Sequence, residues 1–152
     1  MTVMRREREF ALLVPRWSSG TTSNEEYIAS FEAGTITADS FHHADHVRLA
    51  FAYLDKFSVL DALGRLCVAL ERFAAAQGKP ERYHETITYA YFFLVNERKA
   101  KGHFKDWEQF ARDNPDLLRR EDRILNRYYE QVTLDSDLAR RVFVFPDKFE
   151  RA

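Results

Sequence analysis

FHHADHVRLAFAYL, residues 41–54, is the segment on which the predicted fold depends, because three histidines within five residues lead into an almost wholly apolar run. At 100° per residue, Val47, Ala50 and Leu54 fall within about 40° of His43 on a helical projection. The segment therefore reads as a core helix with imidazoles at its head. A buried face of this kind requires other helices to cover it.

The same projection predicts how the polar residues of this helix face. His43 points inward, and His46 lies about 60° to one side, still flanked by apolar positions. His42 lies further round and is the histidine expected to meet solvent. Asp45 and Arg48 fall on the opposite half of the helix, which should face water.

A second stretch, YHETITYAYFFLV (83–95), also predicts an inward histidine. His84 is centred on the stripe formed by Thr88, Tyr91 and Val95, while Glu85 is a quarter-turn away and can face either the core or solvent. Apolar neighbours offer no partner to an imidazole nitrogen, so each inward histidine implies a polar neighbour, a metal ion or water.

These observations together predict a shared site in the interior. His43 and His46 stand at i, i+3, a spacing that lets two side chains of one helix reach one ion, and His84 can supply a third nitrogen ligand from a neighbouring helix. Three neutral imidazoles suit Zn, Fe, Cu or Ni and not the oxygen-preferring Mg or Ca. Glu85 is either a fourth ligand, a general base, or simply a favourable charge in the first turn of its helix.

The rest of the chain predicts an all-α protein, an antiparallel bundle of four main helices with short extra helices and an extended C-terminal tail. The 152 residues are expected to form a single domain, with 1–22 as a poorly ordered lead-in. The expected helices are 24–33 after a Ser23 cap, one from Thr37 or Asp39 to Lys56, one from Ser58 to Gly78, 82–99, a short one over 104–112, and a last long one from Asn114 and Pro115 through Tyr129, before a tail over 142–149.

Composition excludes several classes of function. The 23 Lys and Arg residues nearly cancel the 24 Asp and Glu residues, so no net field favours nucleic acid or an anionic membrane. No run approaches the roughly 18 apolar residues that a membrane-spanning helix needs. Cys67 is the only cysteine and is expected to be a small core residue. We therefore expect a cytoplasmic protein, with a small-molecule ligand and a homodimer as its conceivable partners.

Three motifs resemble those of an uncharacterised family of small bacterial proteins: H-x-x-H on His43 and His46, Y-H-E-T-I-T from Tyr83 to Thr88, and a closing YY…S…AR…F-x-x-PD pattern from Tyr128 to Asp147. That family usually has threonine where this chain has His42, which leaves His42 outside any shared site. The resemblance implies that the other histidines act together, and it implies no reaction.

Two functions from different classes follow. One is a small metalloenzyme in which an open ion polarises a small organic substrate while Glu85 handles protons. The other is a non-catalytic ligand-binding or interaction module whose histidines are satisfied by structural partners.

Overall fold

The computed structural model describes residues 23–148, which contain helices and no strand, so the all-α prediction is confirmed. The longer helices are α2 (Asn24–Glu32), α3 (His43–Lys56), α4 (Val59–Ala76) and α5 (Glu85–Lys101), and the shorter ones are α6 (Trp107–Asp113), α7 (Pro115–Leu118), α8 (Gln131–Leu134) and α9 (Asp137–Arg141). No helix in this part of the chain is both long and apolar enough to cross a membrane. The predicted lead-in over 1–22 lies outside the described residues.

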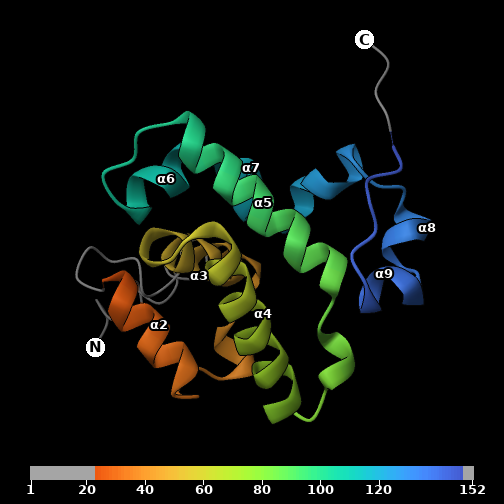
Figure 1. The fold of residues 1–152 in the computed structure, drawn as a ribbon, viewed down its shortest axis with the longest axis horizontal. Coiled ribbons are helices and arrows are strands. Elements are labelled where there is room, and N and C mark those ends of the chain that lie inside the picture. The colour runs from red at the N-terminus through yellow and green to blue at the C-terminus, as the bar shows by residue number, and fades with distance from the viewer. Residues whose placement is uncertain (1–22, 149–152) are drawn as a thin grey trace, which may run out of the picture.

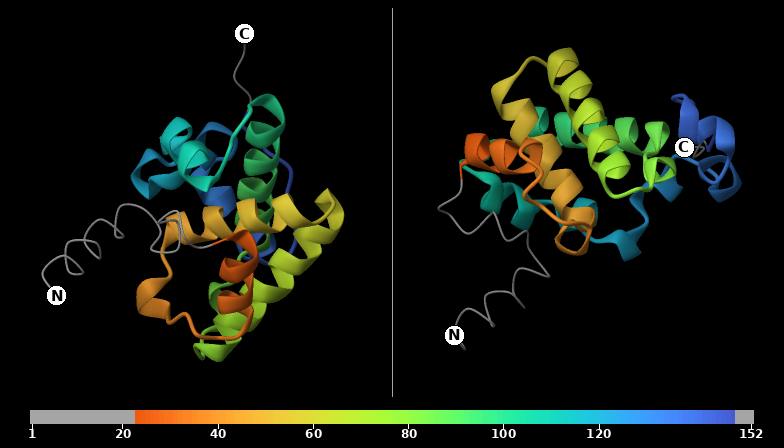
Figure 2. Two further views of the ribbon diagram at one scale, coloured as in Figure 1. Left: turned by 90° about the vertical axis from the view of Figure 1, so that its left-hand side faces the viewer. Right: turned by 90° about the horizontal axis from the view of Figure 1, so that it is seen from below.

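Helix α3 is the central element of the molecule (Figure 1). It packs against α2, α4, α5 and α7. Every residue from Val47 to Tyr53 is buried, so no side of this part of α3 faces water. Figure 2 shows α2 at one end of the long axis and α8 and α9 at the other. The antiparallel order of a four-helix bundle stays a prediction.

The helix ends carry the signals that their sequences predict. Ser23 caps α2, since its hydroxyl oxygen accepts the amide hydrogen of Glu26 at 3.1 Å. Gly34 and Gly78 follow α2 and α4 with φ of +73°, a left-handed conformation that glycine adopts without strain. The helix boundaries near 33 and 78 are therefore confirmed.

Two helices begin later than predicted. Thr37 precedes only a short 3-10 turn, Ala38–Ser40, and α3 starts at His43, where the Asp45 carboxylate accepts the amide hydrogen of His42 at 2.9 Å. Likewise Pro80–Arg82 forms a separate 3-10 turn, and α5 starts at Glu85. His84 consequently stands at the cap of its helix and not within a helical face.

The prediction of a last long helix from Pro115 is wrong. Helix α7 ends at Leu118 because Arg119 is extended, and Arg123 adopts a left-handed φ of +44° between two 3-10 turns. The tail begins at Val142, which is extended, and residues 143–148 form neither helix nor strand. The tail lies against the start of α5, where the Thr86 hydroxyl donates to the Val142 carbonyl at 2.9 Å. Tyr129 also holds it, donating to the Val144 carbonyl at 2.7 Å.

Candidate functional site

His84 is buried, as predicted, but it serves the fold with both ring nitrogens. Its Nδ1 accepts the amide hydrogen of Ile87 at 3.1 Å and so caps α5. Its Nε2 lies 2.8 Å from the Leu134 carbonyl oxygen, and because a carbonyl only accepts, this nitrogen must carry the proton. Burial lowers the pKa of His84 and favours this neutral form.

His43 is half-buried and bonds to a different part of the chain. Its Nε2 donates to the Leu117 carbonyl at 2.9 Å, and its ring lies edge-on to Tyr91 with centroids 4.7 Å apart. Burial lowers the pKa of His43 as well. Tyr91 stands seven residues after His84, or about 10 Å along the axis of α5. His43 and His84 therefore lie beside different parts of α5.

His46, which the projection placed to one side of the apolar stripe, is exposed. Its Nδ1 lies 3.2 Å from the His42 carbonyl oxygen, and one face of its ring packs on Phe41 at 4.4 Å between centroids. His42 is exposed, as predicted.

The predicted metal centre receives no support from these contacts. Among residues 23–148, no three His, Cys, Asp or Glu side chains gather into a group that can hold a metal ion. A metal on His84 would also have to displace either the amide hydrogen that caps α5 or the ring proton that is bonded to the Leu134 carbonyl. Glu85 is engaged too, because its carboxylate accepts the Tyr83 hydroxyl at 2.5 Å. The transition metal and the catalytic role of Glu85 stay predictions.

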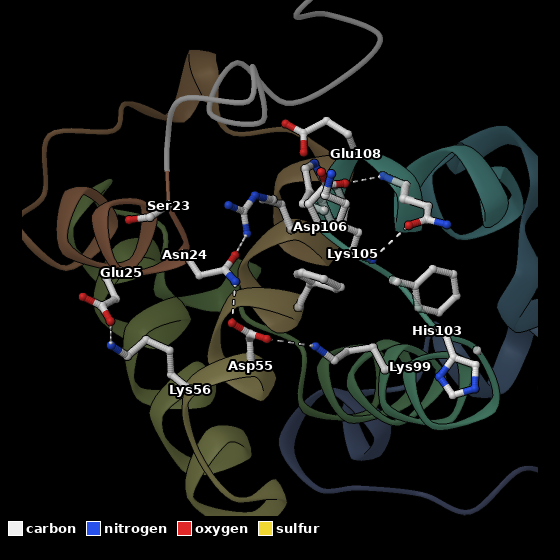
Figure 3. Close-up of a pocket in the computed structure, with 16 residues that line it drawn as sticks. Ser23, Asn24, Glu25, Asp55, Lys56, Lys99, His103, Lys105, Asp106 and Glu108 are labelled. Atoms are coloured by element: carbon white, nitrogen blue, oxygen red, sulfur yellow. Dashed lines mark hydrogen bonds and ion pairs between the residues drawn. The ribbon is translucent and has the colours of Figure 1, made fainter.

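A different part of the molecule contains a large cavity. It measures about 1080 Å³ and lies between the first turn of α2, the part of α3 from Arg48 to Lys56, the end of α5, the connection from Gly102 to Asp106, and the first turn of α6 (Figure 3). We call it the Arg48 pocket, after the arginine of α3 that lines it. Lys99 lines it from the far end of α5, 15 residues or about 22 Å along the helix axis from His84.

Arg48 is almost completely buried, although its side chain is charged. Only 1% of its surface is exposed, although the helical projection placed it facing water. Its guanidinium lies over the rings of Tyr27 and Trp107, at 4.7 and 5.4 Å from their centroids. Nη1 donates to the Asn24 side-chain oxygen at 2.5 Å, whereas Nε is buried with no hydrogen-bond partner.

No carboxylate within the described part of the chain forms an ion pair with Arg48. Asp55, Asp45 and Glu108 act on it only from longer range. Burying an ionised group without a paired counter-charge costs several kcal/mol, so an unpaired buried arginine is an unusual feature. Trp107 adds a second unusual donor to the same pocket, since it is 3% exposed and its indole Nε1 has no partner.

Other charged side chains of the pocket form ion pairs with one another. Asp55 lies between Asn24 and Lys99, accepting from the Asn24 amide at 2.8 Å and pairing with Lys99 at 3.7 Å (Figure 3). Lys56 pairs with Glu25 at 2.6 Å at the other side of the opening. The Lys99 ammonium also lies 4.0 Å from the centroid of the Phe51 ring, and burial lowers its pKa.

Reasoning from the sequence missed this pocket because the projection assumed that α3 has one wet face. Helices surround α3, so the supposed outer residues Asp45 and Arg48 are buried with the rest. One signal was available: Arg48 is the only charged residue in the run VRLAFAYL (47–54). Lone charges inside apolar runs are costly to bury and so mark positions that need a partner.

Comparisons of the chain with protein-family models, with curated proteins and with solved structures give no match. The resemblance to a bacterial family with H-x-x-H and Y-H-E-T-I-T motifs therefore stays a prediction. The function therefore has to be inferred from the geometry of the histidine region and of the Arg48 pocket.

Proposed function

We propose that this chain is a non-catalytic binding module that holds a small polar ligand in the Arg48 pocket. The observation that carries the proposal is the pair of buried, unpartnered N–H donors, Arg48 Nε and Trp107 Nε1, on residues that line one large cavity. Buried donors are nearly always bonded in folded proteins, and exceptions call for an unseen partner. The volume of about 1080 Å³ is slightly larger than the roughly 300–1,000 Å³ typical of small-molecule sites.

The histidines fit the binding module better than they fit a reaction centre. His43 and His84 each donate to a backbone carbonyl, and these bonds tie α3 to α7 and the start of α5 to α8. Glu85, the predicted base, holds a tyrosine hydroxyl. These bonds support a structural role for the predicted catalytic and ligand residues.

Nuclear magnetic resonance of the ¹⁵N-labelled chain tests the proposal. The protein is screened against small polar compounds in four groups: organic acids, amino acids, sugars and nucleosides. At least one compound should bind saturably, with shifts concentrated in the backbone amides of 23–25 and 99–109 and in the Trp107 indole N–H. Shifts concentrated around His43 and His84, or no saturable binding at all, would contradict the proposal.

A blocking variant and its control make the test sharper. His103→Trp adds a large ring at an exposed position of the pocket lining and should weaken binding about tenfold or more, by occupying the space of the ligand. Tyr128→Trp adds an indole at an exposed position outside the pocket and should leave the affinity within about twofold.

A further inference from the structure

We infer that the ligand of the Arg48 pocket is a small organic monocarboxylate whose carboxylate pairs with the guanidinium of Arg48. This inference rests on the proposed function and specifies the chemical class of its ligand. Three features of the pocket support it: the free edge of the Arg48 guanidinium, the charges around the cavity, and the aromatic part of the lining.

The guanidinium has one edge left for a ligand. Nη1 is bonded to Asn24, and within residues 23–148 that is the only hydrogen bond of this side chain, which leaves the edge formed by Nε and Nη2. Two parallel N–H groups on one edge of arginine match the two oxygens of a carboxylate. Because Nε is buried, the guanidinium must turn this edge toward the cavity as the ligand enters.

The charges of the lining favour one negative charge and disfavour several. The wall carries four basic side chains and four acidic ones: Arg48, Lys56, Lys99 and Lys105, against Glu25, Asp55, Asp106 and Glu108. Lys56 already has Glu25 at 2.6 Å, while Arg48 has no carboxylate at ion-pair distance among the described residues. A single carboxylate at Arg48 therefore gains a counter-charge, whereas a nucleotide or another polyanion would meet the nearby acidic groups.

Aromatic side chains supply surface for the remainder of the ligand. Phe51, Phe104 and Trp107 line the same cavity, so an apolar or planar group attached to the carboxylate can pack against them. Benzoate has both features and serves as the probe. Benzamide has nearly the same shape without the charge, and phenyl phosphate carries a different oxyanion on the same ring.

The experiment titrates the ¹⁵N-labelled full chain with each probe and follows the Arg48 Nε–H and Trp107 Nε1–H signals. Benzoate should move both signals saturably, and benzamide should bind at least about tenfold more weakly because it leaves the buried charge unpaired. Arg48→Met should lower benzoate affinity by about tenfold or more, and Lys99→Met should lower it severalfold through the loss of a nearby positive charge. Lys101→Met, which removes an exposed lysine of the same helix that pairs with Glu97 outside the pocket, is the matched control and should change it less than about twofold.

Each other outcome has a separate meaning. If benzamide and benzoate bind the pocket equally well, the carboxylate inference is refuted while the binding module survives. If phenyl phosphate binds about tenfold more tightly than benzoate, the ligand class is a phosphate and the inference is again overturned. If no probe and no screened compound moves the pocket signals, both the inference and the proposed function fail. Should Arg48→Met not fold, Lys99→Met and the benzamide comparison still decide the question.

Discussion

The ends of α5 illustrate two ways in which this protein treats buried polar groups. At its N-terminal end, His84 uses both ring nitrogens, one for the cap of α5 and one for the Leu134 carbonyl. At its C-terminal end lies a pocket in which the buried Arg48 and Trp107 each retain an unpartnered nitrogen. Both regions contain polar groups that burial disfavours, yet only one of them satisfies those groups from within the described chain. Unsatisfied donors, and not the mere presence of buried histidines, therefore distinguish a candidate binding site from a structural clamp.

The largest effect should come from removing the satisfied group. His84→Ala is expected to lower the free energy of unfolding by about 2–4 kcal/mol, because α5 loses a cap and the Leu134 carbonyl loses its buried partner. Urea denaturation followed by circular dichroism measures this change. His103→Ala, at an exposed histidine outside the helices, is the control and should stay within about 0.5 kcal/mol. Equal losses from the two variants would mean that His84 does not clamp the fold.

A smaller effect should appear on acidification. Burial lowers the pKa of His84 in the folded protein, while the unfolded chain has the ordinary value of about 6.5. Below that pH the unfolded chain binds the proton more readily, so the contribution of His84 is complete above about pH 6.5 and is lost as the pH falls toward the folded pKa. His84→Asn can retain the cap without titrating, which isolates this contribution from that of His43 and other groups.

The measurement is urea denaturation of both proteins at pH 7.5, 6.5 and 5.5. The stability advantage of the wild-type chain over His84→Asn should shrink as the pH falls. A constant difference across this range would show that the proton on His84 is not linked to folding.

The ends of the helices show which features of the fold could be predicted from the sequence. Ser23, Gly34 and Gly78 act through the geometry of their own turns, so both ends of α2 and the C-terminal end of α4 were predictable from the local sequence. The end of α7 was not, because no glycine or proline at Arg119 or Arg123 marks the extended and left-handed backbone that these arginines adopt. Local signals define helix caps, whereas tertiary packing decides where an otherwise continuous pattern breaks.

The candidate site was less predictable than the fold. His84 was correctly expected to be buried, but its partner Leu134 is 50 residues away, and nothing in either segment announces that pairing. The Arg48 pocket combines residues from α2, α3, α5, α6 and the stretch before α6, so its identity depends on which helices surround α3. A projection of one helix cannot contain that information.

Replacing the unsatisfied group should have a still smaller effect on stability. Arg48→Met removes a buried charge and keeps an apolar chain of similar length, so we expect the free energy of unfolding to change by less than about 1 kcal/mol, or to rise. The lost bond to Asn24 and the contacts with the Tyr27 and Trp107 rings oppose the relief of an unfavourable buried charge. Thermal and urea denaturation both report this change. A loss of about 3–5 kcal/mol, typical of breaking a buried ion pair, would show that the folded chain already supplies a partner for Arg48.

The smallest effect is expected from a metal chelator, which tests directly whether the histidine region binds a metal ion. Because the nitrogens of His84 serve a cap and a carbonyl, the folded protein should gain nothing from a transition metal at that residue. Untagged protein should therefore contain much less than one equivalent of Zn, Fe, Cu or Ni by elemental analysis. Excess EDTA should shift the melting temperature by less than about 1 °C. A change of 1 kcal/mol in the free energy of unfolding would shift it by roughly 2–4 °C in a chain of this size. A stoichiometric metal that disappears in both His43→Ala and His84→Ala would reverse the comparison, since it would require these imidazoles to leave their carbonyls and converge on one ion.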